Sequence, residues 1–225
     1  MPRREERRDL QTIPVGSLGI IPLRGYESFA EKVDAFLVKW RKERENEHKG
    51  SLSFSGYERS SFILDSEVPR FGSGEGKGVI KESVRGDDLY LLVDITNYSM
   101  VYSLFDQENH MSPDDHYQDL KRIIAAVGGK ARRINVIMPF LYEGRQHKRT
   151  GRESLDCAIA LQELVAMGVD NIITFEAHDP RVMNAIPLHG FETVRTTYQF
   201  IKGLLNHIPD LQLDSDHMMV ISPDE

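Results

Sequence analysis

Four short apolar runs constrain the fold of this chain most strongly. They are 89–93 (LYLLV), 134–138 (INVIM), 171–175 (NIITF) and 218–221 (MMVI). None shows the regular alternation of polar and apolar residues that marks a strand with one solvated face. Nearly continuous apolarity is typical of strands buried on both faces, as in a parallel sheet. The four runs are therefore predicted to be strands of one such sheet.

Segments with helical periodicity separate the runs. At 117–127 one apolar stripe follows a capping sequence, Ser-Pro-Asp-Asp at 112–115, and the stripe consists of Leu120, Ile123, Ile124 and Val127. A second helix is predicted at 153–167 and a third at 197–206. For the second helix the inward residues are predicted to be Leu155, Ala158, Ile159 and Leu161. The alternation of strand and helix predicts an α/β fold, an open doubly wound parallel sheet flanked by helices.

The first third of the chain gives weaker signals. One long amphipathic helix is predicted at 26–44, and 62–64 and 79–80 resemble antiparallel edge strands. Between them lies the glycine-rich stretch 71–78 (FGSGEGKG). It neither follows a buried parallel strand nor opens a helix, so it fails the context of a dinucleotide-binding loop. A hairpin or hinge is the simpler interpretation.

Composition excludes several classes of protein. The 225 residues carry a net charge of −7, which disfavours a generally basic nucleic-acid binder. No apolar run approaches the roughly 18 residues that span a bilayer, so no membrane association is expected. Residues 1–12 form a charged tail without the apolar core of a secretory signal. The lone cysteine, Cys157, indicates a cytoplasmic chain and has the apolar neighbours of a core residue.

Polar residues with useful chemistry follow three of the predicted strands. In an open α/β sheet, ligands bind outside the carboxyl ends of the strands. The stretch 139–152 follows the second run and holds four cations within eight residues, namely Arg145, Lys148, Arg149 and Arg152. Such a cluster suits a polyphosphate, which needs several converging donors. A solvated surface loop is the alternative interpretation.

Two further residues are candidate metal ligands. His178 follows the third run, and Asp224 follows the fourth. A single histidine at a strand end is more often a hydrogen-bonded structural residue. If His178 binds an ion, its nitrogen suits a transition metal better than Mg²⁺, which prefers oxygen. Glu176 and Asp179 flank this histidine and could support it or cap a helix.

Taken in order, these fragments resemble the amino-terminal portion of the ribose-phosphate pyrophosphokinase (phosphoribosyl pyrophosphate synthetase) family. The residues that carry the resemblance are the helix at 26–37, RFGSGE at 70–75, ESVRGDD at 82–88, the stretch 139–153, EAH at 176–178 and SPD at 222–224. ESVRG and the ordered set are the specific part of the match.

The resemblance implies a type I phosphoribosyltransferase-like fold that is used twice. Residues 13–190 would form the first domain and 191–225 the start of a second. The activity implied is transfer of the diphosphoryl group of ATP to the 1-hydroxyl of ribose 5-phosphate by a homo-oligomer. Arg145 and Gln146 match ATP-contacting positions, and His178 and Asp224 match positions associated with Mg²⁺. The residues Phe71, Ser73 and Glu75 match a loop that reaches the adenine of a neighbouring subunit's ATP.

Several positions depart from the family's pattern. His147 stands where the family usually has Asp, and Asp179 stands where it has Ala. Lys148 and Arg149 exchange their residue types, and Ser154-Leu155 replaces Pro-Ile. Gly72 and Ser73 alter the adenine loop, and extra residues occur near 42–60 and 98–112.

The resemblance leaves the activity open. Sequence that the family carries beyond Ser-Pro-Asp, including the ribose 5-phosphate loop, is not among these residues, so this chain alone is expected to be inactive. One alternative is a catalytically silent regulatory or assembly protein of the same fold. Another is an RNA-binding module built on the basic loop, whose affinity would fall steeply with salt.

Overall fold

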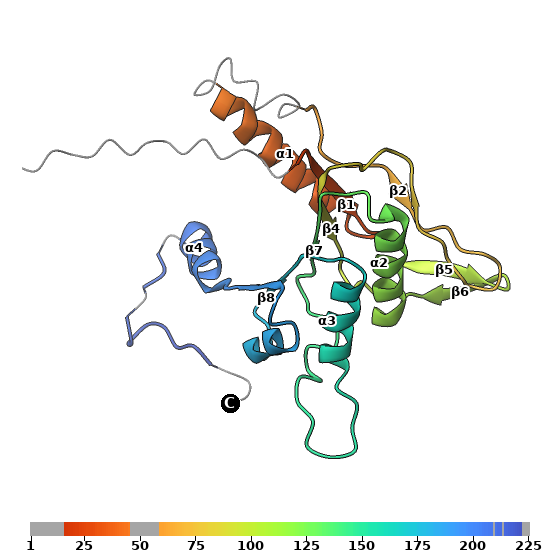
Figure 1. The fold of residues 1–225 in the computed structure, drawn as a ribbon. Helices are drawn as coiled ribbons and strands as arrows, with labels where there is room; N and C mark the ends of the chain where they lie inside the picture. The colour runs from red at the N-terminus through yellow and green to blue at the C-terminus, as the bar shows by residue number, and fades with distance from the viewer. Residues whose placement is uncertain (1–15, 46–58, 209, 213, 222–225) are drawn as a thin grey trace, which may run out of the picture. The chain divides into compact units, whose positions relative to one another are not determined.

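The computed structural model describes residues 16–45, 59–208, 210–212 and 214–221 of the chain (Figure 1). These residues fall into two compact units that divide between Thr193 and Val194, and each unit is described by itself. The predicted tail at 1–12 and the candidate metal ligand Asp224 lie outside the described residues.

A five-stranded sheet forms the centre of the first unit, in the order β1-β4-β7-β8-β9. Its strands are β1 (Leu18–Pro22), β4 (Asp88–Leu92), β7 (Arg133–Ile137), β8 (Asn171–Phe175) and β9 (Gly190–Val194). The pairs β1·β4, β4·β7 and β7·β8 are all parallel. Three of the four apolar runs are therefore strands of a parallel sheet, as predicted.

Helices cover both faces of this sheet. On one face, Leu89 and Leu91 of β4 belong to a core shared with α2 (Pro113–Val127) and α3 (Asp156–Ala166). On the other, Leu92 packs with Ala30 of α1 (Glu27–Glu45). Because neighbouring residues of a strand point to opposite faces, one apolar run supplies both cores. The predicted doubly wound α/β architecture is confirmed.

The ends of α2 follow the predicted capping chemistry. Ser112 and Asp115 form a reciprocal capping box at its start. Gly128 ends it with a φ of 59°, a left-handed conformation that glycine adopts without strain.

The inward face of α3 differs from the prediction. The helix begins at Asp156, and its buried residues are Cys157, Ala160, Leu161 and Leu164. Ile159 is 57% exposed. Each residue turns a helix by about 100°. The prediction counted Leu155 as inward, and this rotated the predicted inward face away from the observed one, which contains Cys157 and Ala160. The core position of Cys157 is confirmed.

The segment 62–64 also differs from the prediction. Ile63 forms a parallel bridge with Ile20 of β1, and the Ile20 amide donates to the Phe62 carbonyl at 2.8 Å. The segment therefore extends the main sheet beyond β1. Only 79–80 forms an antiparallel edge: β3 (Val79–Ile80) pairs with β2 (Ser66–Glu67). The full burial of Phe62 explains the difference, because its side chain joins the core beneath α1.

The extra residues near 98–112 form a small antiparallel hairpin. Its strands are β5 (Val101–Leu104) and β6 (Gln107–His110). A short 3₁₀ helix, η2 (Pro180–Ala185), follows the loop after β8. Among the described residues, no helix combines the length and apolarity needed to cross a bilayer.

The second unit contains the predicted third helix, α4 (Thr197–His207). The predicted strand at 218–221 is wrong: Met219, Val220 and Ile221 are about four-fifths exposed and adopt no regular structure. A strand needs a neighbour to satisfy its backbone donors and acceptors. The described part of this unit offers only a helix, so the run has no strand to pair with.

Candidate functional site

The loops that follow β7 and β8 meet at the carboxyl ends of these strands. His147 lies in the first loop and His178 in the second, and their ring centroids are 5.2 Å apart. The Nε2 atom of His147 also lies 3.5 Å from Oδ2 of Asp179. The side chain of His147 is only 12% exposed, so this contact lies beneath the surface of the loops. The structure thus joins residues more than thirty positions apart in the sequence.

Asp179 is held in place by its own turn. Its carboxylate accepts hydrogen bonds from the Arg181 backbone amide at 2.9 Å and from the Arg181 guanidinium at 2.5 to 3.0 Å. These bonds make it the N-terminal cap of η2. Hydrogen bonds from Arg181 hold the pKa of Asp179 well below its usual range. The side chain that faces His147 is therefore a fixed carboxylate at neutral pH.

The predicted ATP-contacting pair, Arg145 and Gln146, lies midway along the loop that joins β7 to α3. The side-chain amide of Gln146 donates to the backbone carbonyl of Ser154 at 2.7 Å, which joins the middle of the loop to its end. Arg145 is exposed, and its backbone carbonyl lies 3.0 Å from Nδ1 of His147. In this arrangement Gln146 closes the loop from within, while the guanidinium of Arg145 faces solvent.

The other cations of this loop, Lys148, Arg149 and Arg152, are exposed as well. Their exposure is compatible with anion binding and with a solvated surface loop.

The glycine-rich stretch begins with a tight hairpin, as predicted. The Phe71 amide donates to the Glu75 carbonyl at 2.7 Å, and the Gly74 amide donates to the Phe71 carbonyl at 2.8 Å. Gly74 has a φ of +87°, which a residue with a side chain rarely adopts. The Ser73 hydroxyl donates to the Glu75 carboxylate at 2.9 Å, while Phe71 is 53% exposed. The hairpin therefore presents an aromatic ring beside a polar pair.

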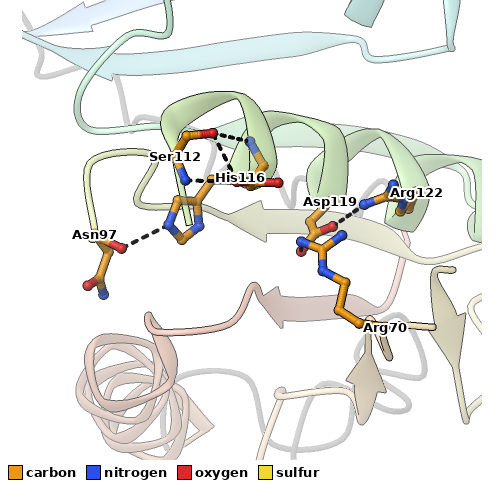
Figure 2. A network of polar contacts seen from close by, with 7 residues as sticks. Arg70, Asn97, Ser112, His116, Asp119 and Arg122 are labelled. Carbon is orange, nitrogen blue, oxygen red and sulfur yellow. Dashed lines mark hydrogen bonds and ion pairs between the residues drawn. The ribbon is translucent and has the colours of Figure 1, made fainter. Parts of the chain in front are cut away.

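A buried ion triad anchors this hairpin to α2 (Figure 2). Arg70 donates to Asp119 at 2.8 Å, and Arg122 donates to the other oxygen of the same carboxylate at 2.6 Å. Burial raises the pKa of Asp119, and the two guanidinium groups oppose that rise. The apolar pattern did not predict this triad, although Asp119, beside Leu120 in the apolar stripe of α2, is a sequence signal for it.

The same helix also holds the loop after β4. His116 is buried, and its Nε2 lies 2.9 Å from the Asn97 carbonyl (Figure 2). The Asn97 amide in turn donates to the Gly25 carbonyl after β1 at 3.1 Å. Helix α2 therefore fixes loops that follow two neighbouring strands at the carboxyl edge of the sheet.

A cavity of about 1340 Å³ lies beside the hairpin. It is lined by the turn after β1, the segment 61–73 and the hairpin β5–β6, and both Phe71 and Ser73 face it. No hydrogen bond, ion pair or ring contact found among the described residues joins Phe71, Ser73 or Glu75 to Arg145, Gln146 or His178. The structure thus brings together the two loops at the sheet edge, and it leaves the hairpin as a separate feature.

The described residues contain no group of three or more His, Cys, Asp or Glu side chains that could hold a metal ion by itself. His178 is exposed, and its predicted companion Asp224 is outside the described range.

Comparison with known proteins places the chain in a family. Residues 20–168 match a family model described as the N-terminal domain of ribose phosphate pyrophosphokinase. A ribose-phosphate pyrophosphokinase of Maricaulis maris is 27% identical over 164 residues, covering 72% of this chain and 46% of that protein. Ribose-phosphate pyrophosphokinase 1 of Schizosaccharomyces pombe is 32% identical over 131 residues, covering 57% of this chain and 27% of that protein. The chain thus spans about half or less of the length of these relatives.

A solved structure agrees with these matches. Phosphoribosylpyrophosphate synthetase from Mycobacterium smegmatis has a TM-score of 0.61 and 19% sequence identity, covering 86% of this chain and 53% of that chain. The fold is thus of the type I phosphoribosyltransferase-like class, as the resemblance implied. With two thirds of its residues matched by the family model, this chain belongs to the family of the N-terminal domain of ribose phosphate pyrophosphokinase.

Proposed function

We propose that this chain is the amino-terminal, nucleotide-binding part of a ribose-phosphate diphosphokinase. The reaction moves the diphosphoryl group of ATP to the 1-hydroxyl of ribose 5-phosphate and gives phosphoribosyl pyrophosphate and AMP. Family membership over 20–168 supports this proposal. The observation that carries it further is the approach of His147 to His178, because it puts the basic loop after β7 beside the loop after β8.

Arg145 and Gln146 are proposed to contact ATP. The guanidinium of Arg145 is exposed at the carboxyl edge, where ligands of open α/β sheets bind. A fixed positive charge there stabilises the phosphates and the negative charge that develops between them during transfer. Gln146 holds the loop closed through Ser154 and so keeps Arg145 at that edge.

Mg²⁺ is the proposed cofactor, with His178 and Asp224 as its protein contacts. A magnesium ion bound with a nucleotide keeps several waters and takes one or two protein ligands in addition to phosphate oxygens. Because Mg²⁺ prefers oxygen ligands, the exposed imidazole of His178 would contact the ion through one of these waters, and no complete cluster is present among the described residues. The ion would supply charge neutralisation at the phosphates.

Phe71, Ser73 and Glu75 are proposed to contact the adenine of ATP bound to a second copy of the chain. An exposed aromatic ring can stack on a base, and a carboxylate can accept a hydrogen bond from an exocyclic amine. The exposed ring of Phe71 leaves the hairpin open to such a contact. The anchor formed by Arg70 and Asp119 would hold the hairpin rigid for that role.

The chain by itself is proposed to be inactive, in a cytoplasmic setting. The chain spans about half or less of the length of these relatives. The resemblance described above implies that the ribose 5-phosphate loop lies outside these residues. AMP formation from ATP and ribose 5-phosphate should stay at background for the purified chain. Turnover at the rate of a complete enzyme would contradict this part of the proposal.

A regulatory or assembly protein of the same fold is the second candidate. The observation that favours it is the fixed carboxylate of Asp179 facing His147, a pairing that departs from the family's pattern at both positions. Such a protein would keep the fold and the oligomer but would not bind ATP with Mg²⁺.

An RNA-binding module would bind RNA with strong salt dependence and would not respond to ATP.

Calorimetric titration of ATP in the presence of Mg²⁺ tests the proposal. Arg145→Ala and His178→Ala should each weaken ATP binding by about tenfold or more, since charged contacts contribute roughly 1.5 to 3 kcal/mol. His189→Ala is the control, because this histidine is also exposed but precedes β9. ATP affinity that is unchanged in both test variants, or absent in the wild-type chain, would overturn the proposed nucleotide site.

A further inference from the structure

The hairpin β5–β6 packs against the glycine-rich hairpin that presents Phe71. The Phe105 amide, at the tip of β5–β6, donates to the Gly72 carbonyl at 3.2 Å (Figure 1). A Cβ at Gly74 would lie 2.9 Å from the Leu104 side chain, so the two hairpins approach as closely as a glycine permits. The tip of β5–β6 is therefore held beside the hairpin that carries the proposed adenine contacts.

The ion triad anchors both hairpins at once. The Arg70 guanidinium donates to Asp119 at 2.8 Å, and it also lies over the Tyr102 ring of β5, 5.0 Å from the ring centroid. A guanidinium over an aromatic face is an attractive cation–π contact. Since Arg70 directly precedes Phe71, one side chain fixes the glycine-rich hairpin to α2 and to β5–β6.

The tip of β5–β6 has a costly conformation. Leu104 pairs with Gln107, so only Phe105 and Asp106 form the loop between the strands. Their φ angles are 49° and 62°, the left-handed values of a type I′ turn, which favours Asn and Gly. A bulky residue with positive φ is strained. Phe105 is also 77% exposed, so neither backbone preference nor burial accounts for a phenylalanine at this position.

Phe105 and Phe71 line the same cavity of about 1340 Å³. More than half of each residue is exposed. Exposed aromatic rings at the wall of an open cavity can stack on the flat face of a nucleobase. Asp106 lines the cavity too, and its carboxylate can accept a hydrogen bond from an exocyclic amine. The chemistry of this wall therefore suits a purine base.

We propose that Phe105 is a second base-contacting residue, which acts with Phe71 on the adenine of ATP bound to a second copy of the chain. The inference rests on the proposed function, because it concerns the same nucleotide. It assigns a role to the extra residues near 98–112, which depart from the family's pattern. A ring at this position adds affinity for the base but not for the phosphates, so Phe105 favours nucleotides over other polyphosphates.

Calorimetric titrations of the full chain with ATP and with inorganic triphosphate, both in the presence of Mg²⁺, test this role. Phe105→Asn removes the ring and supplies a residue that the turn favours. It should weaken ATP binding by about 5- to 100-fold, the range expected for the loss of one stacked ring, and leave triphosphate binding unchanged. Phe105→Tyr keeps the ring and should bind ATP like the wild type.

Phe36→Ala is the matched control. Phe36 is 58% exposed, lies on α1 and is not among the described residues that line the cavity. Its substitution should leave both affinities unchanged. ATP affinity that Phe105→Asn leaves unchanged, or that falls together with the triphosphate affinity, would overturn the inference.

Thermal unfolding separates this role from a structural one. Phe105→Asn relieves the strain of the turn, so its melting temperature should equal that of the wild type or exceed it by about 2 to 4 °C. A variant that loses ATP affinity without losing stability supports a ring kept for binding. A melting temperature that falls together with the ATP affinity would overturn the inference, since the ring would then serve the fold.

The result can be told apart from the test of the proposed function. Arg145→Ala should weaken the binding of both ATP and triphosphate, whereas Phe105→Asn should weaken only that of ATP. A chain that binds ATP independently of Phe105 keeps the proposed function and loses this inference. If the wild-type chain binds no ATP, titration with adenosine decides. Adenosine binding that Phe105→Asn weakens keeps the base contact, and its absence overturns the inference together with the proposed function.

Discussion

Tyr142, in the loop after β7, stacks on Tyr117 of α2 with ring centroids 4.2 Å apart and planes only 8° from parallel. The Tyr142 hydroxyl also donates to Asp114 in the first turn of α2 at 2.6 Å. On the other side, the Tyr117 hydroxyl donates to the Ala160 carbonyl of α3 at 2.8 Å. The loop that carries Arg145 and Gln146 is thus fastened to α2, and through Tyr117 to α3.

Two substitutions of Tyr142 separate its hydrogen bond to Asp114 from its ring stack on Tyr117. Tyr142→Phe removes only the hydrogen bond to Asp114 and should lower the free energy of unfolding by about 1 kcal/mol. Tyr142→Ala also removes the ring pair and should cost roughly a further 0.5 to 1.5 kcal/mol beyond the lost burial. Urea unfolding of both variants measures this. Equal stability of the two variants would show that the ring stack contributes nothing.

The same pair predicts a loss of stability in alkaline solution. Burial raises the pKa of the Tyr117 and Tyr142 phenols above the ordinary value of 10.0. The folded chain therefore holds these protons more tightly than the unfolded chain. Their contribution to stability is complete below pH 10 and declines as the pH rises above that value. In urea unfolding at pH 8 and pH 11, Tyr117→Phe should lose less stability between the two pH values than the wild type does. A loss of equal size would contradict the prediction.

Substitution of the central carboxylate of the ion triad should lower the stability more than substitution of one of its arginines. Asp119 is 6% exposed at its side chain and faces two guanidinium groups. Asp119→Ala leaves the buried guanidinium of Arg70 and the partly buried one of Arg122 without this counter-charge, and it should destabilise the chain by about 3 to 5 kcal/mol. Arg122→Ala should cost less, because Arg70 still pairs with the carboxylate. Denaturant midpoints of the two variants, compared with that of the wild type, decide the order, and a larger loss for Arg122→Ala would refute it.

Gly72 and Gly78 of the glycine-rich stretch 71–78 should respond differently to substitution by alanine. A Cβ at Gly78 would lie 2.3 Å from the Arg122 carbonyl oxygen. Gly78→Ala must therefore displace the backbone of α2 or that of the segment leading into β3, and it should lower the stability. A Cβ at Gly72 would meet no atom within 4 Å, and its φ is not positive. Gly72→Ala should therefore be neutral or stabilising by up to about 1 kcal/mol, through the unfolded state. Thermal unfolding that shows equal effects at the two positions would contradict this reading.

Apolar patterning predicted the centre of the fold well and its edges poorly. Runs such as 89–93 are recognisable because both faces of the strand are buried. β1 escaped notice because its five residues include Gly19 and Pro22, which depart from the usual composition of a strand. β6 has the sequence Gln-Glu-Asn-His and lies mostly at the surface, so no apolar signal marks it.

The candidate site was predictable only in part. The position of His178 and of the basic loop at strand ends followed from the alternation of strands and helices, and the structure places both at the carboxyl edge of the sheet. The contact between His147 and Asp179 could not be foreseen, because it depends on how two loops fold toward each other. Whether Arg145, Gln146 and the hairpin at 71–75 bind ATP remains a prediction for the titrations proposed above.

The segment at 62–64, which runs beside β1, limits how two copies of this chain can join. Its Leu64 amide is bound to β1, the Phe62 amide donates to Asp34 at 2.7 Å, and the Ile63 amide donates to the Ser61 hydroxyl at 3.1 Å. A strand from another molecule would find these three donors already engaged, so it could not accept hydrogen bonds from them. Growth of a continuous sheet from one molecule into the next is therefore disfavoured along this segment.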